Sequence, residues 1–525
     1  LAAVYAQVLG VERVGIDDSF FELGGDSLSA MRVITRVNAE LGVQLSARVL
    51  FDAPSVRGLG ERLDRHAATE EAERRTGVGR PTFARVHGLD AVEVHAHDLK
   101  LDRFLDPALL AAAPMLPGPT GDVRTVLLTG ATGFLGRYLA LEWLERMTAV
   151  GGTLICLVRG ASDEAARRRL EETFDSGDPE LLRHFQEMAT DHLEVLAGDK
   201  AEANLGLDEG TWQRLADTVD LIVDPAALVN GVLSYSDLFG PNVVGTAELI
   251  RIAITSKLKP YTYISTSDVG HQVEPSEFTE DADIRVVSPT RKLDGTYGNG
   301  YSNSKWAGEV LLREAHDLCG LPVAVFRSGR VMVDADHVGQ INVPDLFTRM
   351  VLSVVATGLA PASVYKLDAH GNRQRAHYDG LPVGFLAEAI ATLGAQEVDG
   401  FQTYHAMNPH DDGIGLDQYV DWLIEAGYPI QRIDDFGEWL ERFEAALRAL
   451  PEKQRQHSVL DVLMLALQGT EDPEPYDPVR GATAPADRFR AAVQKAKIGP
   501  ANDIPHVSAP IIVKYVTDLQ RLGLL

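Results

Sequence analysis

The chain has 525 residues, which is too long for one hydrophobic core and predicts two or three domains. Its hydrophobic content of 45% and charged content of 24% are those of an ordinary globular protein. The net charge of −27 argues against binding to nucleic acid or to anionic membranes, because both need a basic surface. Neither a signal peptide nor an apolar run of about 20 residues is recognised. The two cysteines, Cys156 and Cys319, are too few for a disulfide framework, so a cytoplasmic location is expected.

Residues 1–64 are expected to form a separate small helical domain. Gly24 and Gly25 interrupt the chain, and a helix is predicted to begin near Asp26 and Ser27. A serine at a helix start is ordinarily an N-cap, and its exposed hydroxyl is also accessible to a modifying transferase. Further helices complete a predicted four-helix bundle, with periodic apolar residues over 1–9, 33–41 and 55–66.

Residues 65–122 are expected to be a linker and docking segment. An alanine-rich charged run over 67–75 precedes glycine and proline residues over 77–81, a composition typical of a partly helical tether. A tether would raise the effective concentration of a group attached to the small domain at a partner site. A plain domain boundary explains the same composition. A short helix is predicted over 99–113.

A glycine-rich turn organises the remainder of the chain, 123–525. The apolar run 125–128 predicts a buried strand, residues 137–144 predict a helix, and TGATGFLG over 129–136 joins them. This is the setting of a dinucleotide phosphate site, because glycines let the pyrophosphate approach the backbone near a helix N-terminus. A tight structural turn would require the same glycines. The residues expected to hold the phosphates are Gly130, Thr132, Gly133, Phe134, Leu135 and Gly136.

Strands and helices alternate after this turn, which predicts an α/β fold with a parallel sheet. The second strand, 153–158, ends at Arg159, where NAD enzymes usually carry an acidic residue that binds the ribose 2′-hydroxyl. An arginine can bind a 2′-phosphate instead, so NADPH is favoured over NADH. Arg169 on the next helix is a second candidate contact. The alternative for Arg159 is a solvated surface charge.

A second set of polar side chains follows the fifth predicted strand, 261–270. Thr266 and Ser267 lie toward its carboxyl end, the edge at which open α/β sheets bind ligands. Tyr301 and Lys305 open the next helix and are four residues apart, so they share one helical face. A hydroxyl, a phenol and an ammonium group at one sheet edge are candidate catalytic groups.

From about residue 335 the chain is expected to form a helical lobe that covers the substrate. Helices are predicted over 419–426, 436–450, 458–467 and 510–522. His271, His377 and His405 lack the spacing of metal ligands, so no metal is predicted.

The nucleotide-binding part resembles the extended branch of the short-chain dehydrogenase/reductase superfamily. The resemblance rests on the G-x-x-G-x-x-G turn and on Thr266, Tyr301 and Lys305, which match the catalytic Ser/Thr-Tyr-Lys set. It implies a Rossmann-type sheet, and its Gly-Asp pair makes Asp199 a candidate adenine contact. One residue of slippage along the strand would select Ser267 in place of Thr266.

The chain as a whole resembles the C-terminal half of carboxylic acid reductases. Residues 17–32 look like the phosphopantetheine attachment site of carrier proteins, which makes Ser27 the modified residue. Residues 80–88 and 374–380 look like the reductase family in particular. The resemblance implies a phosphopantetheinyl transferase as a partner, and an adenylation domain of the parent chain that activates an acid. The acyl group then passes to the 4′-phosphopantetheine of Ser27.

The same resemblance implies the reaction, reduction of the carrier-bound acyl thioester to an aldehyde with NADPH. Thr266 would hydrogen-bond to the oxyanion that develops, and Tyr301 would donate the proton. Lys305 would lower the pKa of this tyrosine and hold the nicotinamide ribose.

One departure from the family concerns the product. Carboxylic acid reductases typically read RSDMI after the strand that ends near Phe326, whereas this chain reads RSGRV over 327–331. The aspartate is thought to confine reduction to the carrier-bound thioester, and Gly329 replaces it here. Its absence favours onward reduction of the aldehyde to the alcohol.

Three other functions compete with this one. The chain also fits the terminal reductase module of a nonribosomal peptide synthetase. An epimerase-like domain with an appended carrier is disfavoured, since free sugar nucleotides need no tether. A nucleotide-binding scaffold without catalysis is disfavoured by the Tyr301 and Lys305 pair.

Overall fold

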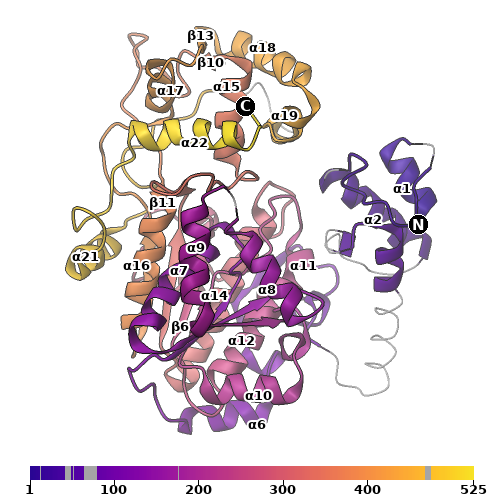
Figure 1. Ribbon diagram of the computed structural model, residues 1–525, viewed down its shortest axis with the longest axis vertical. Helices are drawn as coiled ribbons and strands as arrows, with labels where there is room; N and C mark the ends of the chain where they lie inside the picture. Colours follow the sequence, from indigo (N-terminus) through magenta and orange to yellow (C-terminus); the bar gives the residue numbers. More distant parts are fainter. Residues whose placement is uncertain are drawn as a thin grey trace.

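The structure is a computed structural model that describes residues 1–11, 13–25, 27–41, 49–50, 53–63, 80–175, 177–467 and 474–525. At its centre is a seven-stranded parallel sheet with the strand order β12-β8-β6-β5-β2-β3-β4 (Figure 1). The strands are β2 (Thr125–Thr129), β3 (Thr153–Val158), β4 (Leu193–Ala197), β5 (Leu221–Asp224), β6 (Tyr261–Thr266), β8 (Val323–Ser328) and β12 (Phe401–Ala406). The expected Rossmann-type sheet is confirmed, although β12 is not predicted by the sequence.

Helices cover both faces of the sheet, which explains its almost continuously apolar strands. One face is covered by α7 (Phe134–Val150), α8 (Asp163–Glu172), α9 (Pro179–His192), α16 (Val383–Gln396) and α21 (Asp487–Ala496), and the other by α10 (Glu209–Thr218), α12 (Gly245–Ala253) and α14 (Asn299–Cys319). Val126 and Leu128 of β2 pack toward α7 and α16, whereas Leu127 packs toward α12 and α14. The strand order reverses direction between β2 and β5, where ligands of such sheets bind.

Short segments connect these elements. They are η4 (Ala203–Gly206), α11 (Tyr235–Leu238), the π-helical turn η5 (Phe239–Val244), η6 (Ser267–Gln272), α13 (Ile284–Val287), β9 (Val331–Met332) and β11 (Leu381–Pro382). The pair β9 and β11 is parallel and lies between the sheet and the lobe that follows.

The C-terminal lobe lies above the sheet at the top of Figure 1. It contains α15 (Leu346–Thr357), α17 (Leu416–Glu425), α18 (Phe436–Ala449), α19 (Glu452–Gln456), α20 (Leu460–Leu467), α22 (Ala509–Arg521) and the parallel pair β10 (Leu359–Pro361) and β13 (Gln431–Ile433). Phe347 of α15 packs against Tyr419 of α17 and Tyr515 of α22, with ring centroids 5.7 and 5.1 Å apart. The helical lobe expected from the sequence is therefore present, and aromatic contacts between distant segments hold it together.

Part of the expected linker lies in the core of the nucleotide-binding domain. Residues 83–115 form α5 (Phe83–His87), β1 (Glu93–His95), η1 (Ala96–Asp98), η2 (Leu101–Arg103), α6 (Pro107–Ala112) and η3 (Ala113–Met115). β1 pairs antiparallel with β7 (Thr290–Lys292), and Val86, Val94 and Leu99 are buried beside α14 and η5. Packing there removes their apolar side chains from water, which a solvated tether would leave exposed. The charged run over 67–75 lies outside the described residues.

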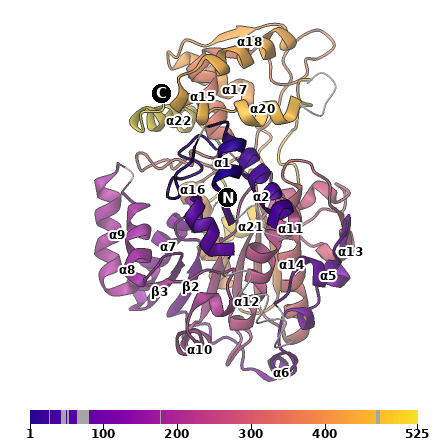
Figure 2. The same ribbon diagram turned by 90° about the vertical axis from the view of Figure 1, so that its right-hand side faces the viewer.

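The small N-terminal domain contains α1 (Ala2–Leu9), α2 (Ser27–Leu41) and a helical stretch over 56–63. Tyr5 and Phe20 are fully buried and meet edge to face, with ring centroids 5.3 Å apart. The apolar cluster of this domain continues into Leu233 and Leu238 of the larger domain. In Figure 2 the small domain lies in front of the sheet, below the helical lobe.

None of the helices in the described part of the chain combines the length and the apolar character that crossing a bilayer requires.

Candidate active site

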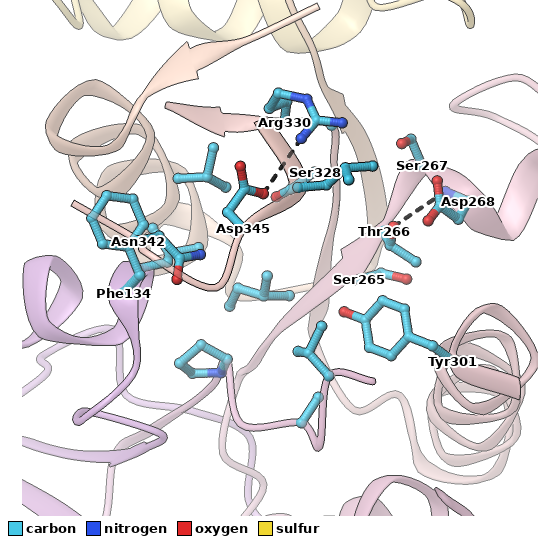
Figure 3. A pocket seen from close by; sticks show the side chains of 18 of the residues that line it. Phe134, Ser265, Thr266, Ser267, Asp268, Tyr301, Ser328, Arg330, Asn342 and Asp345 are labelled. Carbon is cyan, nitrogen blue, oxygen red and sulfur yellow. Dashed lines mark hydrogen bonds and ion pairs between the residues drawn. The ribbon is translucent and has the colours of Figure 1, made fainter. Parts of the chain in front are cut away.

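A large cavity of about 1240 Å³ lies along the carboxyl edge of the sheet. It extends from the glycine turn after β2, past the ends of β3, β5, β6 and β8, to the first turn of α15 (Figure 3). Open α/β sheets bind their ligands at this edge, and the helical lobe provides the opposite wall.

The glycine turn forms one end of the cavity. Gly130 has a φ of 63°, and a Cβ there would lie 2.9 Å from the Cα of Ala226. A Cβ on Gly136 would collide with the carbonyl oxygen of Gly130. The backbone therefore turns tightly and α7 begins at Phe134, so its free N–H groups face the cavity. The predicted phosphate-binding residues Gly130, Thr132, Gly133, Phe134, Leu135 and Gly136 all line the cavity.

The end of β3 brings two arginines together. Arg159 lines the cavity directly after the strand. Arg169 of α8 reaches back, and its Nη1 donates to the carbonyl oxygen of Arg159 at 3.1 Å. Arg167 instead pairs with Glu171 on its own helix at 2.8 Å, so of these two helical arginines only Arg169 touches the end of β3.

Asp199 lines the cavity beside this corner, directly after β4. Its Oδ1 accepts from the backbone N–H of Ala201 at 2.9 Å, which fixes the side chain at the end of the strand. The predicted adenine contact therefore lies at the cavity wall.

The catalytic candidates lie at the other end of the cavity. Thr266 and Tyr301 both line it, and in Figure 3 the Tyr301 phenol projects toward the end of β6 next to Thr266. The Thr266 hydroxyl accepts from the backbone N–H of Asp268 at 3.2 Å, which leaves its proton available to a ligand. Ser265 does not compete for this role, because its hydroxyl donates to buried Glu309 at 2.5 Å. Ser267 also lines the cavity but lies farther from Tyr301 in Figure 3.

The position of Lys305 differs from the one expected beside the nicotinamide ribose. Its Nζ lies 3.8 Å from the ring centroid of Tyr263, its side chain is buried, and it is absent from the cavity wall. Burial, followed by the charge of Lys200, lowers the pKa of Lys305 to about 7. Burial, followed by the charge of Asp268, raises the pKa of Tyr301, so the expected lowering by Lys305 is wrong for this structure. A protonated phenol is the form that donates a proton.

A buried network beneath the cavity is not anticipated by the sequence. Asp224 at the end of β5 accepts from the Thr129 hydroxyl at 2.6 Å, the Tyr261 hydroxyl at 2.8 Å and Lys200 Nζ at 2.5 Å. Lys200 lines the cavity and also donates to the carbonyl oxygen of Ala226 at 3.1 Å. The network joins the ends of β2, β4 and β5, and it holds a second ammonium group near Lys305. The Gly-Asp-Lys sequence after β4 is the only local signal for it.

The space beside Gly329 is occupied by a carboxylate from elsewhere in the chain. A Cβ on Gly329 would overlap Asp379 Oδ2. That carboxylate accepts from the backbone N–H groups of Arg330 at 3.2 Å and Asn408 at 2.6 Å, and it lines the cavity. Burial raises the pKa of Asp379 in spite of these hydrogen bonds. The place expected to lack a carboxylate therefore contains one, supplied by residue 379.

The sequence assigns no role to Arg330 beyond its place in the RSGRV segment, 327–331. Its guanidinium lies 5.2 Å from the Tyr378 ring centroid, and it pairs with Asp345 at 3.4 Å. Figure 3 shows Arg330 and Asp345 on the wall contributed by the lobe.

Ser27 is the first residue of α2, as the sequence predicts for a helix start. Asp26 lies outside the described residues, so the structure describes the attachment motif only in part.

Two family models match the chain. Residues 128–390 match the family described as male sterility protein, and residues 1–63 match the phosphopantetheine attachment site. These ranges coincide with the domain that contains the cavity and with the small N-terminal domain.

Solved structures and curated relatives agree with both matches. The reductase (R) domain of a nonribosomal peptide synthetase from Mycobacterium tuberculosis is 66% identical, with a TM-score of 0.78, over 83% of this chain and 100% of that one. The chain belongs to the reductase-domain family of nonribosomal peptide synthetases and carboxylic acid reductases. As a family member it is an oxidoreductase with an NAD(P)-binding reductase domain and a phosphopantetheine carrier domain.

Curated relatives of the carrier and reductase domains are longer proteins. A carboxylic acid reductase from Mycobacterium marinum is 64% identical over 97% of this chain, and an isonitrile lipopeptide synthase from M. tuberculosis is 63% identical over 100% of it. The chain spans 43% of the former and 21% of the latter. A thiolation-reductase di-domain from an archaeal nonribosomal peptide synthetase, 20% identical with a TM-score of 0.58 over 99% of this chain, shares the fold.

Proposed function

We propose that the chain reduces an acyl thioester, bound to the phosphopantetheine of Ser27, to an aldehyde with NADPH. The observation that carries this proposal is the single cavity that joins the glycine turn to Thr266 and Tyr301. The turn fits a dinucleotide, because Gly130 and Gly136 leave no room for side chains and keep the backbone open to a pyrophosphate.

The residues at the end of β6 fit the chemistry of carbonyl reduction. NADPH, when bound, supplies the hydride. Thr266 donates a hydrogen bond to the thioester carbonyl oxygen, which stabilises the negative charge as it develops there. Tyr301 gives its phenolic proton to the same oxygen, and its raised pKa keeps that proton in place at neutral pH. The hemithioacetal then collapses to the aldehyde and the free pantetheine thiol.

Arg159 and Arg169 favour NADPH over NADH. Arg159 lines the cavity at the end of β3, where the ribose 2′ position of a dinucleotide lies in this type of sheet, and Arg169 is hydrogen-bonded to its backbone outside the cavity wall. Asp199 is proposed to contact the adenine, and Lys305 to hold the nicotinamide ribose after its side chain turns from Tyr263 into the cavity.

Gly329 and Asp379 are proposed to form the product gate. The Asp379 carboxylate is engaged by two backbone N–H groups, so it does not project as an aspartate at position 329 would. We therefore expect free aldehydes to be reduced onward to alcohols. NADPH consumption with a medium-chain aldehyde, and chromatography of the product, measure this activity.

The proposed parent protein is a carboxylic acid reductase, whose adenylation domain would load the carrier. A nonribosomal peptide synthetase is the second candidate, favoured by the 66% identical R domain. A phosphopantetheinyl transferase is the proposed partner in either case.

The decisive experiment follows NADPH oxidation by the full chain after its carrier domain has been loaded with an acyl-phosphopantetheine group. Tyr301→Phe should lower kcat by roughly 10²–10⁴-fold, the usual contribution of a positioned general acid, with little change in the KM for NADPH. Tyr297→Phe is the matched control, because Tyr297 is a nearby tyrosine whose side chain is 55% exposed. A Tyr301→Phe enzyme with the wild-type rate would contradict the proposal.

A further inference from the structure

A buried histidine in the lobe wall takes no part in the chemistry described above. His377 lines the cavity and is 4% exposed. Its backbone N–H donates to the carbonyl oxygen of Val479 at 2.6 Å, which fixes it against the segment 476–484. That segment also lines the cavity, on the side of the lobe.

One side of the His377 ring is held by a shared carboxylate. Nδ1 lies 3.1 Å from Asp412 Oδ1, and the same carboxylate binds Nδ1 of His506 at 2.8 Å. The backbone N–H of Ile414 also donates to it at 3.0 Å. Burial opposes the charge on Asp412, but these hydrogen bonds outweigh burial and lower its pKa. Nδ1 of His377 therefore carries a proton, and in an imidazole of this tautomer Nε2 is the acceptor.

The other side of the ring has no hydrogen-bond partner among the residues that the structure describes. Nε2 of His377 is buried and makes no hydrogen bond. A buried polar atom left unpaired costs roughly 1–3 kcal/mol, so such atoms in native structures call for a partner. The neighbouring cavity wall is aromatic and aliphatic, with Tyr365, Tyr378 and Leu416. A ligand that enters this part of the cavity therefore meets aromatic and aliphatic side chains beside the His377 ring.

The proposed dinucleotide site is the glycine turn after β2, whereas His377 lines the cavity from the segment that precedes β11. We infer that Nε2 of His377 accepts a hydrogen bond from an N–H or O–H group of the bound acyl thioester. This inference rests on the proposed function and assigns one polar contact to its substrate. The donor belongs either to the acyl chain, as an amide or a hydroxyl group, or to the amides of the pantetheine arm.

The test compares three substrates in the full chain. Two are pantetheine thioesters of equal length, one with an amide N–H in the acyl chain and one with methylene groups only. The third is a free medium-chain aldehyde, which lacks the arm. His377→Phe removes the acceptor and keeps a ring, His377→Gln retains an acceptor, and His506→Gln is the control because His506 shares Asp412 but lies outside the cavity.

His377→Phe should raise the KM of the amide-bearing thioester by roughly 3- to 10-fold, the usual worth of one hydrogen bond, with kcat almost unchanged. His377→Gln should recover most of this loss, and His506→Gln should behave as the wild type. If the methylene thioester suffers equally while the aldehyde does not, the donor lies in the pantetheine arm. A loss confined to the amide-bearing substrate places the donor in the acyl chain.

Equal effects of His377→Phe on all three substrates would overturn the inference. Should that variant fail to fold, N-methylation tests the same bond from the ligand side. The wild type should then lose a similar factor in KM when the N–H groups of acyl chain and arm are methylated, and no loss would overturn the inference. If the wild type reduces none of the thioesters, the proposed function itself is wrong.

Discussion

Gly329 and Asp379 show how one residue depends on another that lies far away in the sequence. The carboxylate of Asp379 occupies the volume that a side chain at position 329 would need, and it caps the backbone N–H groups of Arg330 and Asn408. Gly329→Asp should therefore destabilise the protein by about 1–3 kcal/mol, the usual cost of overpacking, besides suppressing aldehyde reduction.

The double variant Gly329→Asp/Asp379→Gly should recover more than half of this stability, because it moves the carboxylate rather than adding a second one. Thermal unfolding of the single and double variants measures the effect. A single variant as stable as the wild type would show that Asp379 moves aside at no cost.

Lys305 should make stability depend on pH. Its pKa is lowered to about 7 by burial and by Lys200, with Asp224 and Glu309 opposing, whereas an unfolded lysine titrates near its usual value of about 10.4. Between these values the unfolded chain binds more protons, so stability rises with pH across this window. The variant Lys305→Met has no ionisable group at this position, so its free energy of unfolding lacks this pH-dependent contribution.

The stability advantage of Lys305→Met over the wild type should accordingly shrink from pH 7 to pH 10, by at most about 1.4 kcal/mol per pH unit. Chemical denaturation of both proteins across this range is the measurement, and the difference between them removes the contributions of other lysines. A difference that stays constant with pH would mean that Lys305 is charged in the folded state.

At the scale of elements, the end of β3 and the helix α8 are together proposed to determine the choice of cofactor. Arg169 on α8 is hydrogen-bonded to the backbone carbonyl oxygen of Arg159, so the helix holds a second guanidinium at the end of β3. Arg159→Ala should raise the KM for NADPH at least roughly tenfold, since a charged hydrogen bond contributes about 1.5–3 kcal/mol.

The weaker use of NADH should change little in this variant. Arg168→Ala is the matched control, because Arg168 is an exposed neighbour on the same helix. Steady-state kinetics with both cofactors measure these KM values. Equal losses with NADPH and NADH would contradict the proposed contact of Arg159 with the 2′-phosphate.

At the scale of the whole molecule, the proposed function requires the carrier domain to deliver its thioester to the cavity. The apolar cluster of the carrier continues into Leu233 and Leu238, and Tyr301 packs against the same cluster. The carrier therefore contacts the reductase domain near its catalytic end. Incubation with a phosphopantetheinyl transferase and CoA should add the mass of one arm, and Ser27→Ala should abolish this gain.

Ser27→Ala should still reduce free thioesters and aldehydes at the wild-type rate, because these substrates do not need the attached arm. Mass spectrometry of intact protein and NADPH oxidation are the two measurements. A mass gain in the alanine variant would assign the attachment to another residue.

The local features of this protein follow from its sequence by itself. Apolar runs alternate with amphipathic segments, so the parallel sheet and the helical lobe are predictable, because strands buried on both faces and helices covering them have different periodicities. The glycine turn and the four-residue spacing of Tyr301 and Lys305 are local as well. Each of these two motifs lies within about a dozen consecutive residues, so it can be recognised without knowing the fold.

The tertiary structure alone decided the features that depend on distant parts of the chain. It placed β1 against β7, Lys305 on the ring of Tyr263, Asp379 in the space of Gly329 and His377 on the carboxylate of Asp412. In each case the two partners lie on different elements, and no local pattern records which elements will pack together. Their contacts arise from close packing and from the pairing of buried polar groups, which only the complete fold can satisfy.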